Sequence, residues 1–246
     1  YWGKALSDSN SEDMLARPTI VKIHTVPWST ADVVLGISFF VFQALVVVGL
    51  LIVYVAVFDI NNITILTLIC TLIMEFMLLA TIWIFSLSKY RVHWSALGLW
   101  GRLSVHDGAL SVGVVILGVC LQLGYISVLD AAGVNTDRIE LYNFVGESTA
   151  VLLLLTFLAL IVAPIAEELF FRGFVYGGIA SRYGVCKGAL ASALLFAAAH
   201  IDPLTFLPLF LLGLMYAWLY HRTRKLWGPI FAHFSNNAIA LAVVLV

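Results

Sequence analysis

The sequence predicts an all-α protein built as a bundle of transmembrane helices. Of its 246 residues, 62% are hydrophobic and 11% are charged, whereas an ordinary soluble domain carries about 25% charged residues. The mean hydropathy is +1.04. A helix needs roughly 20 mostly apolar residues to cross a hydrocarbon core of about 30 Å, so we expect about seven spans, within a range of roughly six to eight. The chain should therefore be an integral, multi-pass membrane protein.

Seven apolar runs give the expected spans in order. Gly, Pro, Asn or charged residues separate them, and they lie at about 33–58, 63–88, 108–129, 150–166, 188–201, 204–220 and 228–246. Runs of this length in lipid are expected to be helices, because a helix satisfies its own backbone polar groups. The fourth and fifth runs are short for a crossing.

Three parts follow from this order. Residues 1–30 are polar, contain Pro18 and Pro27, and are expected to form a surface tail at the membrane edge. Residues 31–130 should comprise the N-terminal transmembrane helices and a basic loop, and residues 131–246 the C-terminal core. The chain starts at a Tyr and stops inside the apolar run AIALAVVLV, as expected of a piece of a longer chain.

The basic residues predict the orientation of the bundle. If all seven runs cross, every Lys and Arg except Arg138 falls on the side of the N-terminal tail. This assignment includes Arg172, which follows the fourth run. Such an excess marks the cytoplasmic side or its organellar equivalent, so we expect the N-terminus there.

Composition disfavours two other classes of function. The net charge of −1 and the lack of a basic patch interleaved with aromatics argue against nucleic-acid binding. The three cysteines, Cys70, Cys120 and Cys186, are scattered, so neither a disulfide framework nor a paired-cysteine metal site is indicated. We interpret all three as packing residues.

The stretch APIAEELFFRGF, residues 163–174, places three charges in apolar surroundings. Ionised groups in hydrocarbon are costly unless they are paired or hydrated. Glu168 and Arg172 are four residues apart on a helix and can pair, whereas Glu167 points about 100° away from its neighbour. Pro164 lacks an N–H and should leave a carbonyl free near these charges. The sequence therefore leaves Glu167 without a structural partner.

A hairpin should bring His200 to the level of Glu167. The two residues are 33 positions apart, with their midpoint at Tyr183 and Gly184, where the chain is expected to turn. Residues equidistant from the turn of an antiparallel helix pair lie at the same depth. We therefore expect both side chains within reach of a shared water.

The last apolar run carries a third polar pair. His233 and Asn237 are four residues apart and share a helical face, whereas Asn236 lies on a different one. The turn before this run should place His233 roughly two helical turns into the membrane.

These residues form three ordered motifs that resemble those of the CPBP family, the CAAX-protease and bacteriocin-processing enzymes, also called Abi or Rce1-like intramembrane proteases. The similarity covers about the last 90 residues and, more weakly, the segment HWSALGL at 93–99. The motifs are EExxxR (Glu167, Glu168, Arg172), FxxxH (Phe196, His200) and HxxxN (His233, Asn237). The resemblance implies that 131–246 is a catalytic core.

The resemblance also implies a site. Glu167, helped by His200, would activate a water, and His233 and Asn237 would form an oxyanion hole. A carboxylate in a dry site can act as a general base, and fixed donors stabilise the charge that develops on the substrate. The expected activity is that of an intramembrane endopeptidase acting on a membrane-associated protein or peptide, without metal or cofactor.

The remaining motif residues have structural roles in this interpretation. Glu168 and Arg172 would hold the shape of the site, and Phe196 would be a packing residue. Glu75, a further acid inside an apolar run, has no partner in the sequence, and we expect it to make a hydrogen bond inside the bundle.

Taken singly, the site residues have simpler explanations. Glu167 fits a protonated acid bonded to the carbonyl freed by Pro164, His200 a core histidine, and Asn237 an interhelical hydrogen bond. A zinc site built from Glu and two His is a further alternative. It is disfavoured because the HExxH spacing is absent and Asn is an unusual zinc ligand.

Two other functions remain open at this stage. The chain could be a non-catalytic subunit or assembly factor of a larger membrane complex, with other membrane subunits as partners. A transporter would use the intramembrane charges as a proton path, but no internal repeat favours it.

Overall fold

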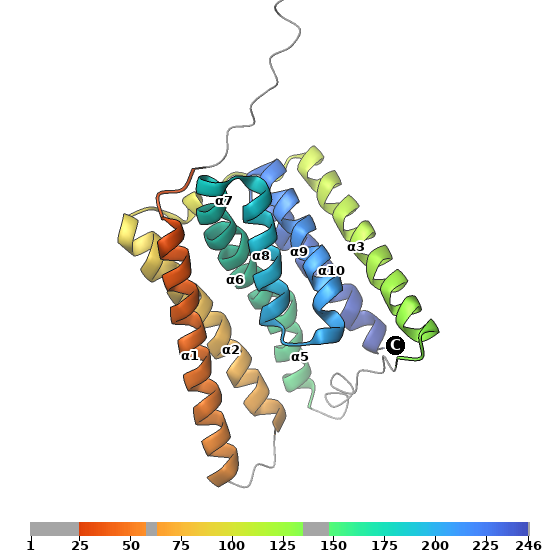
Figure 1. The fold of residues 1–246 in the computed structure, drawn as a ribbon. Coiled ribbons are helices and arrows are strands. Elements are labelled where there is room, and N and C mark those ends of the chain that lie inside the picture. The colour runs from red at the N-terminus through yellow and green to blue at the C-terminus, as the bar shows by residue number, and fades with distance from the viewer. Residues whose placement is uncertain (1–24, 58–62, 135–147, 246) are drawn as a thin grey trace, which may run out of the picture.

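The computed structural model describes residues 25–57, 63–134 and 148–245. Every regular element within these ranges is a helix, which confirms the all-α fold class (Figure 1). The elements are α1 (Thr30–Val57), α2 (Ile63–Ile82), η1 (Trp83–Ser88), η2 (Trp94–Leu97), α3 (Val105–Ala131), α5 (Thr149–Phe157), η3 (Leu158–Val162), α6 (Ala163–Glu168), η4 (Leu169–Tyr176), α7 (Gly177–Tyr183), α8 (Val185–Ala199), α9 (Pro203–Thr223) and α10 (Trp227–Leu245). Of the short segments, η1, η3 and η4 are π-helical and η2 is a 3₁₀ helix.

All seven predicted runs are helical over nearly all of their described residues, but the fifth ends at Ala199 instead of residue 201. Five helical stretches among the described residues are long and apolar enough to cross a membrane: 30–57, 64–88, 105–131, 149–183 and 203–223. The α8 helix is apolar but has 15 residues, about 22 Å at 1.5 Å per residue. The molecule is thus an integral, multi-pass membrane protein whose α8 is shorter than the hydrocarbon core.

The predicted end of the fourth run at residue 166 is wrong. The helical stretch continues from 149 to 183, a length of 35 residues, through η3, α6 and η4. Arg172 is 0% exposed inside the bundle, so counting it among the basic residues on the side of the N-terminal tail is also wrong. The helix continues through these charges because Glu168 and Arg172 pair with each other inside the bundle.

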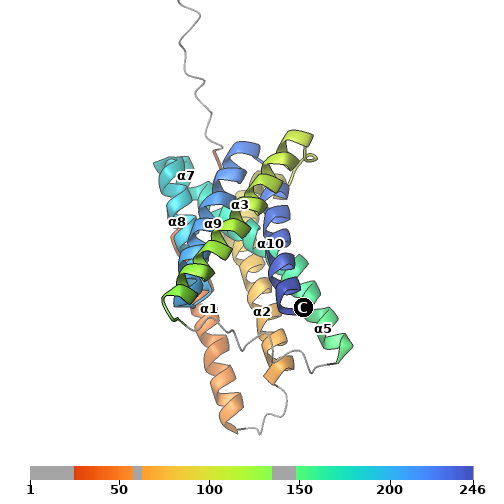
Figure 2. The same cartoon turned by 90° about the vertical axis from the view of Figure 1, so that its right-hand side faces the viewer.

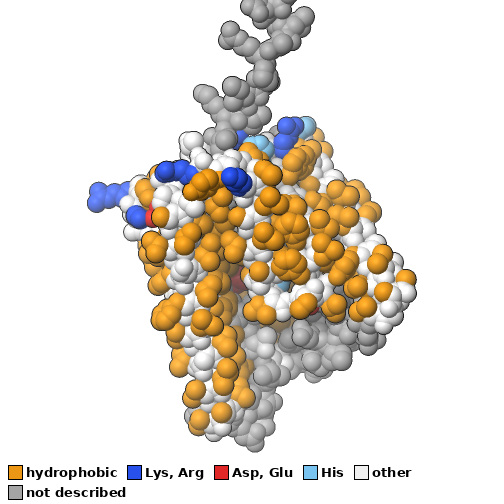
Figure 3. All heavy atoms as spheres, in the orientation of Figure 1, with side chains coloured by type: hydrophobic (Ala, Val, Ile, Leu, Met, Phe, Trp, Pro, Cys, Tyr) orange, Lys and Arg blue, Asp and Glu red, His pale blue; other side chains and the backbone are white. Residues whose placement is uncertain are grey.

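The other described basic residues gather at one end of the bundle (Figure 3). They flank the connections after η1, before α3, between α7 and α8, and between α9 and α10. Figure 1 places these connections at a common end. The basic asymmetry expected from the sequence is therefore present in three dimensions.

The motif helices occupy the centre of the bundle. The α6–η4 segment packs against α8, α10 and α2, and α3 lies along α9 and α10 (Figure 2). A Cβ added to Gly213 in α9 would come 2.9 Å from Cα of Ala193 in α8. This glycine therefore lets the two helices approach closely, as small residues do in membrane bundles.

A polar network fixes the start of α1 to the chain after η1. Asp32 is 1% exposed and accepts hydrogen bonds from the backbone of Ser29 at 2.7 Å, from the Tyr90 hydroxyl at 2.6 Å and from Lys89. The hydrogen bonds to this carboxylate raise the pKa of both Lys89 and Tyr90. The network thus secures the basic end of the N-terminal helices.

The cysteines only partly match their prediction. All three are free, as expected, but Cys120 and Cys186 are exposed and Cys70 is half-buried. The interpretation of Cys120 and Cys186 as packing residues is wrong, because their helices present them on the outer surface of the bundle.

Candidate active site

Glu168 lies at the centre of the polar cluster and has two partners. It is 0% exposed, and its Oε1 accepts hydrogen bonds from Arg172 Nη1 at 2.9 Å and from His233 Nδ1 at 3.0 Å. The pairing with Arg172 confirms the prediction from the four-residue spacing. The second bond connects α6 to α10, so Glu168 also fixes the orientation of an imidazole.

The fold surrounds Arg172 with partners that replace water. Its Nη2 donates to the carbonyl of Gly213 at 3.3 Å, where the close approach of α8 and α9 brings backbone into reach. Its guanidinium carbon lies 4.4 Å from the ring centre of Phe196 and 5.2 Å from that of Tyr216. Aromatic faces and a carbonyl thus add to the stabilisation of a charge that Glu168 balances, although Nε of Arg172 has no hydrogen-bond partner among the described residues.

Glu167 and His233 face each other without touching. Glu167 Oε2 is 4.0 Å from His233 Nε2, which is too long for a direct hydrogen bond. This oxygen is buried and has no hydrogen-bond partner among the described residues. Because Nδ1 of His233 is bonded to Glu168, the other ring nitrogen is directed toward Glu167.

His200 lies apart from this pair, at the end of α8. Its side chain is exposed, and its Nδ1 lies 2.8 Å from the carbonyl oxygen of Phe196. A carbonyl only accepts, so Nδ1 carries the proton and Nε2 of the neutral ring is an acceptor. No hydrogen bond or ion pair joins His200 and Glu167 among the described residues. The imidazole beside Glu167 is that of His233, which differs from the expectation.

The expected hairpin is nevertheless present. The chain turns at Gly184, whose φ of +89° suits glycine. The rings of Phe171 and Phe196 are 5.4 Å apart across this hairpin, and their midpoint in the sequence is the same as that of Glu167 and His200. Glu167 and His200 are therefore expected at one level on neighbouring helices, although no hydrogen bond or ion pair joins them.

Phe196 connects the two imidazoles. Its ring centre is 5.0 Å from that of His200 and 5.7 Å from that of His233, in edge-to-face geometry. The ring is 1% exposed. The packing role expected for Phe196 is confirmed, and the structure adds that this packing links both histidines of the candidate site.

Asn237 is bound to the backbone of the motif helix. Its Nδ2 donates to the carbonyl of Ala159 at 2.9 Å. In this π-helical stretch the N–H of Ala163 bonds to Leu158, five residues back. The equivalent donor for Ala159 would be residue 164, which is a proline. Asn237 thus supplies the hydrogen bond that Pro164 cannot make, and its second amide hydrogen remains available.

Two site residues were not predicted. Tyr216 in α9 stacks on the His233 ring at 5.5 Å with an interplanar angle of 24°, and its hydroxyl oxygen accepts from Asn236 Nδ2 at 2.7 Å. Asn236 is three residues from His233, a spacing that could have indicated a shared side of the helix. Tyr216 carries no comparable signal, since it lies inside an apolar run.

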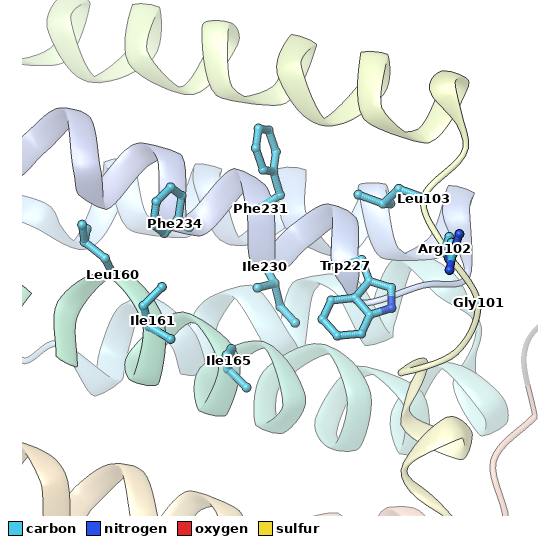
Figure 4. A pocket seen from close by; sticks show the side chains of 10 residues that line it. All are labelled: Gly101, Arg102, Leu103, Leu160, Ile161, Ile165, Trp227, Ile230, Phe231 and Phe234. Atoms are coloured by element: carbon cyan, nitrogen blue, oxygen red, sulfur yellow. The ribbon is translucent and has the colours of Figure 1, made fainter. Parts of the chain in front are cut away.

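A groove of about 510 Å³ adjoins the site. It lies between α10 and the η3–α6 segment, with Arg102 at one end (Figure 4). Ile165 and Phe234 line it and are close in sequence to Glu167 and His233. The lining is almost entirely apolar, so the groove suits an apolar segment or chain next to the cluster.

A comparison with protein families matches residues 149–239 to the family described as "Type II CAAX prenyl endopeptidase Rce1-like". The match contains all three motifs. Residues 149–239 are thus similar to this family. The resemblance to the CPBP family is thereby confirmed for this segment, whereas the wider boundary of the core at 131–246 stays a prediction.

Two curated proteins are similar to somewhat more than half of this chain. One is "Putative membrane peptidase YdiL" of Bacillus subtilis (strain 168), 31% identical over 146 residues, which are 55% of this chain. The other is "Uncharacterized 24.3 kDa protein" of Escherichia coli, 33% identical over 136 residues, 53% of this chain. The chain covers 59% and 60% of the lengths of these relatives. No solved structure matches significantly.

Proposed function

We propose that this protein is an intramembrane endopeptidase in which Glu167 takes a proton from the water that attacks a peptide carbonyl. The observation that carries the proposal is the 4.0 Å separation of Glu167 Oε2 and His233 Nε2. One water molecule or one substrate oxygen can bridge these two atoms from the side of the line that joins them, at about 2.8 Å from each. The Rce1-like match and the relative named as a membrane peptidase support the same class of activity.

His233 is the proposed donor to the oxygen of the tetrahedral intermediate. Its Nδ1 donates to Glu168, so Nε2 can also donate only in the imidazolium form, in which both ring nitrogens carry a hydrogen. The bond to Glu168 fixes the ring, so Nε2 then needs no reorientation when charge develops on the substrate. The second amide hydrogen of Asn237 would complete the oxyanion hole. Its first hydrogen, bound to Ala159, fixes the side chain in place.

His200 has a supporting role in this proposal. Its Nδ1 is occupied by the Phe196 carbonyl, which leaves Nε2 as an acceptor at the open side of the cluster. From there it would help to hold the attacking water. The proton that Glu167 takes from this water passes to the leaving amine, so the carboxylate is regenerated in each turnover.

The substrate we propose is a membrane-associated protein or peptide. The apolar groove beside Glu167 and His233 would accept its hydrophobic part, while the scissile bond lies at the polar cluster. Hydrolysis would need neither metal nor cofactor, because water activation and oxyanion stabilisation are both assigned to side chains of this chain.

Purified protein in proteoliposomes tests the proposal directly. We expect it to cleave members of a peptide library that contains both prenylated CAAX-type and unmodified membrane-anchored sequences. Cleavage should disappear in Glu167→Gln and persist in the presence of metal chelators. Loss of activity with chelators would favour the zinc alternative. A wild-type protein that cleaves nothing, and whose Glu167→Gln variant keeps full biological function, would favour a non-catalytic subunit.

A further inference from the structure

Glu75 and Tyr216 are buried polar side chains to which the proposed reaction gives no role. Glu75 in α2 is 6% exposed, and its Oε2 has no hydrogen-bond partner among the described residues, so the hydrogen bond expected for it is not found at this oxygen. Tyr216 in α9 is 1% exposed, and its ring lies against three residues of the site, Arg172, Phe196 and His233. The surroundings of Tyr216 therefore indicate what this side chain does.

The hydrogen bond to Glu168 holds the imidazole of His233 at one atom. Nδ1 of His233 and Oε1 of Glu168 are 3.0 Å apart, and hydrogen bonds persist over a range of angles, with a preference above about 150°. Small tilts of the ring about this anchor are therefore compatible with the bond. They move Nε2, and with it the separation of 4.0 Å from Glu167 Oε2 on which the proposed reaction depends. Contacts with the faces of the ring are needed to limit such tilts.

The ring of Tyr216 covers one face of the His233 imidazole. The ring centres are 5.5 Å apart and the planes differ by 24°, so the two rings are nearly parallel, at a distance where aromatic pairs attract each other. Phe196 meets the same imidazole at 84°, with its ring centre 5.7 Å away. One neighbour thus limits tilting out of the plane, and the other limits movement in a different direction.

The α10 helix holds Tyr216 at a second point. Asn236, three residues after His233, donates from Nδ2 to the Tyr216 hydroxyl oxygen at 2.7 Å. The same helix therefore presents the imidazole to the ring of Tyr216 and an amide to its hydroxyl. A ring held at its face and at its tip cannot slide along α10 without breaking one of the two contacts. The tyrosine and the histidine consequently keep one relative position.

Small residues let the neighbouring helices close over this arrangement. A Cβ added to Gly118 in α3 would come 3.3 Å from Asn236 Nδ2, so α3 packs directly over the amide. Gly213, three residues before Tyr216, allows α9 to approach α8, the helix that carries Phe196. Asn236 is 5% exposed and Tyr216 is 1% exposed, so their hydrogen bond is shielded from water and strengthened by the low dielectric of the interior.

We propose that Tyr216 is a positioning residue that keeps the imidazole of His233 in the plane from which Nε2 faces Glu167. Asn236 supports it by holding the tyrosine hydroxyl. This inference rests on the proposed function, in which His233 donates to the oxygen of the tetrahedral intermediate. Tyr216 acts through His233 and does not touch the substrate. Because the stacked face of the ring does the positioning, Tyr216→Phe should retain most of the effect and Tyr216→Leu should lose it.

Cleavage kinetics in proteoliposomes, with a peptide identified in the library, provide the first test. Tyr216→Leu should lower kcat by about 10-fold or more and leave KM within about 2-fold, because a misplaced oxyanion donor weakens binding of the transition state only. Tyr216→Phe should recover most of this loss. Asn236→Ala should lower kcat in the wild-type background and add little to Tyr216→Leu, since both act through one ring. A kcat of Tyr216→Leu equal to that of the wild type contradicts the proposal.

Tyr220 offers a matched control on the same helix. It is 3% exposed, its hydroxyl donates to the carbonyl of Leu97 at 3.0 Å, and its ring packs on Tyr176. Tyr220→Leu should therefore lower the stability of the protein and leave kcat unchanged. An equal loss of kcat in Tyr220→Leu and Tyr216→Leu would assign the effect to a general loosening of α9 and would overturn the positioning role.

Nuclear magnetic resonance of protein labelled with nitrogen-15 histidine tests the positioning without any substrate. The Nδ1–H of His233, identified by its absence in His233→Gln, should exchange slowly with water because it is buried and bonded to Glu168. Its exchange should be faster by about 10-fold or more in Tyr216→Leu and unchanged in Tyr216→Phe and Tyr220→Leu. Asn236→Ala, which leaves every ring in place, should show an intermediate rate and decides the question if Tyr216→Leu does not fold.

The two readouts distinguish this inference from the proposed function. Exchange at the wild-type rate in Tyr216→Leu and Asn236→Ala overturns the positioning role, whatever the kinetics of cleavage. Faster exchange in these variants, combined with a wild-type protein that cleaves no peptide, would support the role of Tyr216 in holding His233 and would count against the proposed function.

Discussion

His233 Nδ1 lies 3.0 Å from Oε1 of Glu168, the same oxygen that receives Arg172 Nη1 at 2.9 Å. One carboxylate thus connects a buried cation on its own helix with an imidazole on α10. The arrangement orients His233 toward Glu167. It also makes the two adjacent glutamates unequal, since Glu168 supports the fold and Glu167 faces the space where we place the chemistry.

The two glutamates should therefore respond differently to the same substitution. Glu168→Gln leaves Arg172 buried without a counter-charge, and breaking a buried pair in this way costs about 3–5 kcal/mol. Glu167→Gln removes no described hydrogen bond of Oε2 and should change the free energy of unfolding by less than about 1 kcal/mol. Unfolding of both variants in detergent, followed by circular dichroism, measures the difference. Equal stability of the two variants would contradict the role of Glu168.

Replacing Phe196 should weaken both the fold and the site. Phe196→Leu removes edge-to-face contacts with two imidazoles and the face on which Arg172 rests, at a cost of about 1–3 kcal/mol. Phe157→Leu is a matched control, because Phe157 is 54% exposed on the outer surface, and its effect should stay within about 0.5 kcal/mol. Thermal unfolding compares them. A Phe196→Leu protein as stable as the control would refute the packing role.

Asn237 and Pro164 should be energetically coupled. Asn237→Ala removes the donor to Ala159 and should cost roughly 1 kcal/mol, as for other hydrogen bonds between membrane helices. Pro164→Ala restores a backbone N–H that can bond to the same carbonyl, so Asn237→Ala should cost less in that background. A double-mutant cycle on the free energy of unfolding measures this coupling. Strict additivity would show that the carbonyl is not shared in this way.

The network around Asp32 predicts a loss of stability at alkaline pH. Asp32 raises the pKa of Lys89 above its ordinary value of 10.5 and that of Tyr90 above 10.0. A raised pKa in the folded state stabilises the protein below the unfolded value, and the contribution disappears as pH rises through the folded value. Wild-type protein should therefore lose stability above about pH 10, whereas Asp32→Asn, less stable at neutral pH, should lose less over the same interval. Unfolding temperatures across this range provide the measurement, and parallel pH profiles would contradict the prediction.

Much of the fold could be predicted from the sequence, because helices that cross a membrane appear in it as long hydrophobic runs. The seven runs became helices, and the turn at Gly184 lies where the spacing of Glu167 and His200 required it. The helix end at residue 166 failed for an identifiable reason. From the sequence alone, burial of Arg172 is expected to carry its full desolvation cost. In the fold, the carbonyl of Gly213 and the ring of Phe196 on other helices offset part of that cost.

The site also combines features that spacing within one helix predicts with features that depend on how separate helices pack. The spacing of Glu168 and Arg172 predicted their pair, since both lie on one helix. Which imidazole faces Glu167 depends on how α10 and α8 pack against α6, and no local spacing encodes that choice. Tyr216 was missed because a tyrosine in an apolar run is indistinguishable from an ordinary packing residue until His233 stacks on it.

The central claim is that Glu167 activates water to cut an amide bond. The most direct measurement is single-turnover cleavage, in oxygen-18 water, of a peptide identified in the library, by wild type and by Glu167→Gln. We expect labelled product carboxylate from the wild type and a rate lower by about 10²–10⁴-fold in the variant, the usual contribution of a general base. Cleavage by Glu167→Gln at the wild-type rate, with its fold intact, would contradict it.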